Sequence, residues 1–148
     1  MQTVQDILDH KHQQGASAVE SIYVDKTALD AARKMNARRV GALLVVERDR
    51  MPIGIVTERD MLTRIIAAER DPAYTSVEAI MTSPVLTCRP STKLDELRQV
   101  MRENRIRHVP VMLDRGVIGM VSIGDLNFAR SETMVETIRA LEAYITGV

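Results

Sequence analysis

Apolar residues recur along this chain at the spacing of helices. Two sets of three apolar residues occupy positions i, i+3 and i+7, so each set lies on one face of a predicted helix: Ala28, Ala31 and Met35, and Leu94, Leu97 and Met101. Residue types that cap helices precede both sets: Asp25 and Thr27, and Ser91 and Thr92. The pattern predicts two equivalent helices in the two halves of the chain.

Two short apolar runs follow each of these helices. They are Ala42–Val46 with Ile53–Thr57, and Val109–Leu113 with Val117–Ser122. The intervening Asp49-Arg50 and Asp114-Arg115-Gly116 are typical of hairpin turns. A further helix is predicted after each hairpin, with these apolar residues: Met61, Leu62, Ile65 and Ile66 in the first half, and Leu126, Met134, Ile138, Leu141 and Ile145 in the second. Each half is therefore predicted to be strand, helix, strand, strand, helix, a βαββα unit of the α/β (α+β) class.

The two halves are copies of one another. Three pairs of segments align in the same order: Thr3–Leu8 with Ser76–Met81, Met35–Val45 with Met101–Val111, and Ile53–Asp60 with Ile118–Asp125. The first copy carries extra residues in the polar stretch Asp9 to Ser17, and Asp71-Pro72-Ala73 marks the junction. We therefore predict one unit over residues 1–72, with the N-terminal segment, and a second over residues 73–148, with the C-terminal helix. Packing the two together would bury apolar sheet and create a cleft between near-equivalent surfaces.

A motif of a glycine, a hydroxyl residue and an aspartate lies where the second strand of each hairpin passes into the next helix. It reads GIVTERD from Gly54 to Asp60, and GMVSIGD from Gly119 to Asp125. A helix start presents free backbone N–H groups, to which Thr57 or Ser122 could add a hydroxyl donor for phosphate. The carboxylate of Asp60 or Asp125 could accept hydrogen bonds from the two hydroxyls of a ribose. The glycines would allow backbone and ligand to approach closely. The competing interpretation is a capping box, in which hydroxyl and carboxylate satisfy N–H groups of their own helix.

A basic pair, Arg107-His108, precedes the third strand of the second copy, where arginine suits phosphate through its planar donor fork. The first copy has Gly41 and Ala42 at the corresponding positions, so the two candidate sites are expected to be unequal. We interpret the neighbouring Arg105 as solvated surface.

Composition narrows the classes of function. The formal net charge is zero and there are four aromatic residues, which argues against a nucleic-acid binder. The single cysteine, Cys88, excludes an intrachain disulfide and is expected to pack as a small hydrophobe. The start of the chain lacks signal-peptide character, and the longest apolar run, Val40–Val46, is too short for a bilayer. We predict a cytoplasmic protein with no membrane partner and, because His10 and His12 do not share a helix face, no metal site.

GIVTERD, GMVSIGD and the segment RIRHVPV, residues 105–111, together resemble the CBS domain, named after cystathionine β-synthase. The resemblance covers nearly all of the chain and is to small bacterial proteins made of a CBS pair. It implies two units about a pseudo-twofold axis, and dimerisation of the pair. It also implies site roles, as follows: ribose held by Asp60 and Asp125, phosphate approached by Thr57, Ser122, Arg107 and His108, and adenine lined by Ile55 and Met120. Arg59 would compensate for the missing basic pair in the first copy.

The expected function is that of a homodimeric regulatory sensor. An adenine nucleotide such as AMP, ADP, ATP or NAD would occupy the cleft, and an unidentified partner protein would respond to its presence. No catalytic cofactor is expected, and because no nucleophile–base pair or metal cluster accompanies the cleft, we expect no enzyme activity. Two alternatives stay open: a ligand-independent interaction and dimerisation module, and a nucleotide hydrolase using Asp60 and Asp125 as acid and base. The C-terminal stretch Ser131–Thr146 would either cap the core or seal the dimer.

Overall fold

A computed structural model describes residues 1–15, 19–114 and 116–146 of the chain. The chain folds into two compact units, Ala18–Leu86 and Met1–Ser17 together with Thr87–Val148. We call them the contiguous unit and the two-segment unit, and describe each by itself.

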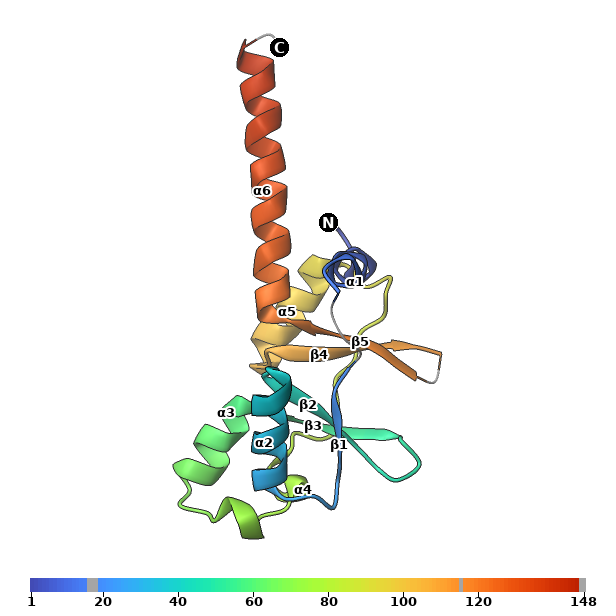
Figure 1. Cartoon of the computed structure of the whole chain (residues 1–148). Coiled ribbons are helices and arrows are strands. Elements are labelled where there is room, and N and C mark those ends of the chain that lie inside the picture. The colour runs from blue at the N-terminus through green and yellow to red at the C-terminus, as the bar shows by residue number, and fades with distance from the viewer. Residues whose placement is uncertain (16–18, 115, 147–148) are drawn as a thin grey trace. The chain divides into compact units, whose positions relative to one another are not determined.

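The contiguous unit is built on a three-stranded sheet in the order β1-β2-β3. Strand β1 (Ser21–Tyr23) runs parallel to β2 (Ala42–Val46), and β2 runs antiparallel to β3 (Pro52–Thr57). Helix α2 (Ala28–Arg38) connects β1 to β2, as a parallel crossover requires. After β3 come the short helix α3 (Glu58–Asp60), the π-helix η1 (Met61–Ile66), the 3-10 helix η2 (Pro72–Tyr74) and α4 (Val77–Ile80). Figure 1 shows α2 lying across one face of this sheet.

The local sequence accounts for these elements. The hydroxyl of Thr27 accepts a hydrogen bond from the backbone N–H of Asp30 and caps α2, as predicted. The apolar face of α2 is buried against the sheet, in a core that includes these residues: Ile22, Ala28, Ala31, Met35, Leu43, Val45, Val56, Ile65, Val77 and Ile80. The predicted helix face and hairpin of the first copy are confirmed.

The two-segment unit repeats most of this arrangement. It comprises α1 (Val4–Gln13), α5 (Leu94–Asn104), the antiparallel hairpin of β4 (His108–Leu113) and β5 (Gly116–Ser122), and α6 (Ile123–Thr146). The strand expected before α5 is reduced to a single parallel bridge between Cys88 and Val111. Pro84 and Pro90 flank this short segment and have no N–H to extend a ladder. Helix α5 begins after Lys93, so the predicted caps Ser91 and Thr92 lie too early.

The repeated segments that come first in each copy are Thr3–Leu8 and Ser76–Met81, and we call them the leading segments. They are exchanged between the copies. Val4 and Ile7 of α1 belong to the core of the two-segment unit, whereas Val77 and Ile80 of α4 belong to that of the contiguous unit. Equivalent antiparallel backbone bridges hold the two leading segments in place: Thr3 pairs with Lys93, and Thr27 pairs with Ser76.

The predicted division into residues 1–72 and 73–148 therefore differs from the observed one. The repeat in the sequence located both leading segments correctly, but each one packs on the core of the other copy. The extra residues predicted in the first copy lengthen α1 to Gln13, and residues 16–18 lie outside the described residues.

Several predicted apolar faces are not buried within their own unit. In η1, Ile65 is buried, but Leu62 and Ile66 are exposed. In α6, Leu126 and Ala129 are buried, but the side chains from Arg130 to Thr146 are exposed, so this part of the helix does not cap the core. No helix among the described residues has both the length and the apolar character to cross a bilayer.

Candidate functional site

The Gly-hydroxyl-Asp motif occupies the same place in both units. Thr57 ends β3 directly before α3, and Ser122 ends β5 directly before α6. The neighbouring hairpin strand starts opposite each hydroxyl residue, because Ala42 pairs with Thr57 and His108 pairs with Ser122. The structure therefore places each motif where a strand passes into a helix, as predicted.

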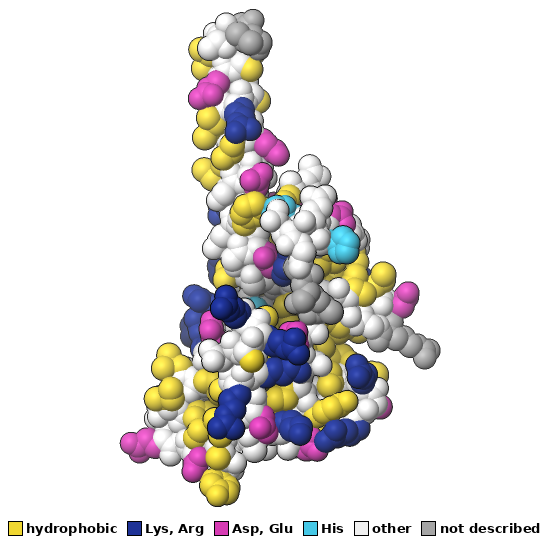
Figure 2. Space-filling model, viewed as in Figure 1, with side chains coloured by type: hydrophobic (Ala, Val, Ile, Leu, Met, Phe, Trp, Pro, Cys, Tyr) yellow, Lys and Arg dark blue, Asp and Glu magenta, His cyan; other side chains and the backbone are white. Residues whose placement is uncertain are grey.

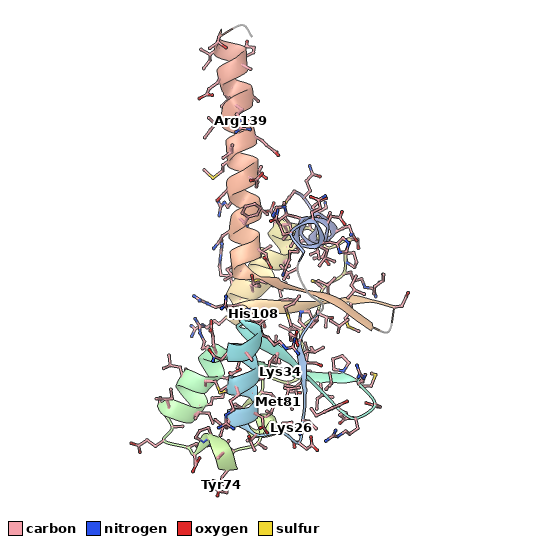
Figure 3. All side chains as sticks on the ribbon, in the orientation of Figure 1. Lys26, Lys34, Tyr74, Met81, His108 and Arg139 are labelled. Carbon is pink, nitrogen blue, oxygen red and sulfur yellow. The ribbon has the colours of Figure 1, made fainter. Side chains whose placement is uncertain are left out.

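The basic pair lies beside the motif of the two-segment unit. The N–H of Ile123, the first residue of α6, donates to the carbonyl of Arg107 at 2.8 Å. Figure 3 labels His108, which begins β4. In the contiguous unit the equivalent bond runs from the N–H of Glu58 to the carbonyl of Gly41 at 3.0 Å. The two motifs therefore have unequal surroundings, one with a basic pair and one without.

The hydroxyl and carboxylate of each motif form a capping box. In the contiguous unit the N–H of Thr57 donates to Oδ2 of Asp60 at 2.8 Å, and the N–H of Asp60 donates to Oγ1 of Thr57 at 3.4 Å. In the two-segment unit the N–H of Ser122 donates to Oδ2 of Asp125 at 2.8 Å, and the N–H of Asp125 donates to Oγ of Ser122 at 3.1 Å. The capping role that competed with ligand binding is thus present in both copies.

The carboxylate of Asp60 is unusually well shielded for an acidic side chain. Asp60 is 8% exposed and is the only charged residue that is buried within the described residues. Its Oδ2 also accepts the hydroxyl of Thr57 at 3.2 Å, and its Oδ1 lies 3.7 Å from Nε of Arg64 on the following turn. A buried carboxylate needs such partners to stay in place.

Lys11 is a site residue that no pattern in the sequence indicated. Its Nζ lies 3.1 Å from Oδ2 of Asp125 and donates to the carbonyl of Met120 at 2.8 Å. Lys11 belongs to α1, which the sequence assigned to the other copy. The repeat could have revealed this contact only if the exchange of leading segments had been known.

The two motif glycines have a packing role that differs from the predicted one. A Cβ on Gly119 would lie 2.5 Å from Cδ2 of Leu8, and a Cβ on Gly54 would lie 2.5 Å from Sδ of Met81. Leu8 and Met81 are equivalent residues of the exchanged leading segments. The close approach that these glycines permit is therefore made by a side chain of the protein, and each motif glycine is a contact point for the leading segment.

The remaining predicted site residues lie beside these groups. Ile55 and Met120 directly precede the core residues Val56 and Val121, so they lie on the opposite face of their strands. Ile55 is buried and Met120 is half-buried. Arg59 is exposed in α3, next to Asp60.

Cys88 packs in the core of the two-segment unit, as predicted for a small hydrophobe. Burial raises the pKa of its thiol to about 11, so the reactive thiolate is scarce near neutral pH. His10 stacks on the ring of Phe128 with a centroid distance of 4.7 Å, which joins α1 to α6. Within the described ranges, no group of three or more His, Cys, Asp or Glu residues is arranged to hold a metal ion.

Two regions of the chain match the model of the same protein family. The model of the family described as CBS domain matches residues 16–67 and again residues 77–132. The chain is 40% identical over 149 residues to the CBS domain-containing protein CBSX3, mitochondrial, of Arabidopsis thaliana, a match that covers 98% of this chain and 72% of the relative. Another relative, CBSCBSPB5 of the same plant, is 34% identical, but the chain spans only 23% of its length.

Solved structures agree with this match. A putative signal-transduction protein with CBS domains from Burkholderia ambifaria MC40-6 superposes with a TM-score of 0.79 at 39% identity, covering 86% of this chain and 92% of that one. A hexameric CBS-CP12 protein from bloom-forming cyanobacteria gives a TM-score of 0.70 at 30% identity, covering 74% of this chain and 64% of that one.

Proposed function

Because the chain belongs to the CBS-domain family, we propose that it is a regulatory module that binds an adenine nucleotide, such as AMP, ADP, ATP or NAD. One observation carries this proposal: the same hydroxyl and carboxylate stand at a strand-to-helix junction twice, with Arg107 and His108 beside one of the two junctions. Capping alone requires neither the second copy nor the basic pair.

Capping and ligand binding are compatible at these carboxylates, since an ionised carboxylate offers about four lone-pair sites. At Asp125, the bond from Ser122 and the ion pair with Lys11 both use Oδ2. We assign Oδ1 to the ribose hydroxyls. In this arrangement Lys11 orients the carboxylate, and Ser122 both caps α6 and faces the ligand.

We assign the stronger phosphate contacts to the two-segment unit. Helix α6 begins directly after Ser122, so the free N–H groups of its first turn are available to an anion. Arg107 is exposed, and its backbone is bonded to the first N–H of this helix. In the contiguous unit α3 continues directly into η1, and Gly41 and Ala42 stand where the basic pair would be, so we expect this motif to bind phosphate more weakly even with Arg59 nearby.

Ile55 and Met120 remain our candidates for lining the adenine, because both lie on the strand face away from their own core. No catalytic cofactor and no enzyme activity are part of the proposal. We also propose that the protein is a cytoplasmic homodimer, and that a partner protein responds to the presence of the bound nucleotide. Of the similar proteins, the CBS-CP12 protein is described as hexameric and CBSX3 as mitochondrial.

Isothermal titration of the purified chain with AMP, ADP, ATP and NAD tests the proposal. Arg107→Ala and Asp125→Asn are expected to weaken binding about tenfold or more, because each removes a charge-assisted contact. Arg105→Ala is the matched control, since this exposed arginine lies outside the motif, and it should bind as the wild type does. Asp60→Asn should weaken nucleotide binding less than Asp125→Asn does.

Binding of none of these nucleotides, with no thermal shift at high ligand concentration, would favour the ligand-independent module. A ligand at a hundredfold excess over its Kd should stabilise the fold by about 2.7 kcal/mol. Turnover of a bound nucleotide that Asp60→Asn abolishes would instead favour the hydrolase.

A further inference from the structure

The outer part of α6 extends away from the unit that contains it. From Arg130 to Thr146 every residue is exposed, a length of about 25 Å at the rise of an α-helix. Figure 1 shows α6 leaving the β4–β5 hairpin as one uninterrupted helix. The match to the family model ends at residue 132, so nearly all of this outer part lies beyond it. A helix of this length without a packing partner is only marginally stable in water.

One edge of the outer helix is apolar. Four large apolar residues follow each other at spacings of four, three and four residues: Met134, Ile138, Leu141 and Ile145. They are between 52% and 80% exposed. Val135 and Tyr144 widen the edge, which Figure 2 shows as a run of hydrophobic side chains along α6. We call the four residues the α6 stripe.

The charges around the stripe favour a protein partner. From Ser131 to Thr146 the helix carries three glutamates and one arginine, Arg139, which Figure 3 labels. Helices that lie on membranes are rich in lysine and arginine on their polar face, because cellular membranes are anionic. An acidic polar face would be repelled by such a surface.

We propose that the α6 stripe pairs in parallel with the α6 stripe of a second copy of the chain. In a heptad assignment, Ile138 and Ile145 occupy a positions and Met134 and Leu141 occupy d positions. β-Branched residues at a with leucine at d favour parallel two-stranded packing. In this register Thr137 at g faces Glu142 at e of the other helix, so no like charges meet.

The area of the stripe sets the strength of this pairing. The four stripe residues and Val135 of each helix, at about 100 Å² each, bury roughly 1,000 Å² in total. That area is at the lower end for specific interfaces, and the stripe spans fewer heptads than a stable isolated coiled coil. We therefore expect a reversible dimer with a Kd in the micromolar range. The inference gives a surface to the homodimer of the proposed function, and it does not depend on nucleotide.

Sedimentation velocity of the full chain without nucleotide, from about 1 to 200 µM, tests the pairing. The wild type is expected to pass from monomer to dimer over this range. Ile138→Glu places a charge in the stripe and should weaken the dimer at least tenfold. Ala143→Glu adds the same side chain on the opposite face and should leave the equilibrium unchanged.

Helicity gives a second readout that does not depend on mass. Circular dichroism at 222 nm should rise with concentration in the wild type and in Ala143→Glu, but not in Ile138→Glu, because pairing orders the outer helix. Ile138→Cys should form an intermolecular disulfide under mild oxidation, since identical a positions face each other in a parallel pair. The native Cys88 is buried and supplies the internal control.

Three outcomes separate this inference from the proposed function. A dimer that is indifferent to Ile138→Glu would overturn the α6 surface and leave the homodimer and the nucleotide site standing. A dimer that Ile138→Glu dissociates but Ile138→Cys does not cross-link would overturn the parallel arrangement. A wild type that is monomeric at every concentration would overturn the stripe pairing and the homodimer, whereas the titrations with nucleotide would still decide the ligand.

Discussion

Adding a single methyl group at Gly54 tests whether the motif glycine serves the protein's own packing. The new Cβ would lie 2.5 Å from Sδ of Met81 and 3.1 Å from the carbonyl oxygen of Thr82. The sulfur could move, but the carbonyl accepts the backbone N–H of Ile55 at 3.0 Å and is held by that bond. The leading segment must therefore shift as a whole, and the bridge between Ile55 and Thr82 is strained with it.

The magnitude follows from these contacts. Overpacking of this kind costs about 1–3 kcal/mol, and weakening one backbone hydrogen bond adds about 1 kcal/mol. Replacing glycine by alanine returns about 0.5–1 kcal/mol by restricting the unfolded chain. We expect Gly54→Ala to lower the free energy of unfolding by about 1–3 kcal/mol, or roughly 4–10 °C in Tm for a chain of this size.

Urea unfolding without ligand, followed by circular dichroism, measures this change. Gly116→Ala is the matched control, because a Cβ there meets no atom within 4 Å, and it should be neutral or slightly stabilising. Gly119→Ala should cost less than Gly54→Ala, since its only close neighbour is the flexible end of Leu8. In a Met81→Ala background the cost of Gly54→Ala should shrink by about 1 kcal/mol.

A Gly54→Ala variant as stable as Gly116→Ala would show that the methyl group fits without a shift of the leading segment. If, in addition, Gly54→Ala lost nucleotide affinity while keeping its stability, the glycine would serve approach of the ligand, as the sequence analysis expected.

Three further predictions concern single side chains. The thiol of Cys88, with its pKa raised to about 11 from 9.0, should react with a maleimide at pH 7.5 at least about a hundredfold more slowly in the folded chain than in urea; equal rates would show that the thiol is accessible. The backbone N–H of Thr27 holds the pKa of Asp30 below its usual value, so the stability it adds is present above about pH 4 and lost as pH falls through the lowered pKa. Melting curves should therefore place Asp30→Asn below the wild type at pH 6, by a gap that narrows as the pH falls below 4, and a gap unchanged by acid would contradict this. Lys11→Ala should cost about 0.5–1 kcal/mol in urea unfolding, and clearly less in an Asp125→Asn background; equal costs in both backgrounds would mean that the ion pair adds nothing.

The sequence was sufficient to predict the local elements, because each depends on a pattern within a few residues. The apolar face of α2 and the capping by Thr27 were correct for this reason. The strand before α5 was predicted to be longer than it is, since proline limits its ladder. What could not be predicted is which core a leading segment joins, because Val4 and Val77 have equivalent surroundings in the sequence and either core would bury them.

In the candidate site too, contacts between neighbouring residues could be predicted from the sequence, and contacts between distant segments could not. Thr57 with Asp60, and Ser122 with Asp125, were identified from spacing alone, and the structure brings both pairs together. Lys11 was missed because its contact with Asp125 spans most of the chain. The packing of Leu8 and Met81 against the motif glycines was missed for the same reason, since these side chains come from other segments of the chain.

The exchange of leading segments also sets an order of events during synthesis on the ribosome. The contiguous unit, Ala18–Leu86, can complete its core as soon as α4 has left the exit tunnel. Helix α1 is made before the contiguous unit but must wait for α5, β4 and β5 before Val4 and Ile7 are covered. Helix α1 thus packs long after it has been translated, and its apolar face is open to chaperones in the interval.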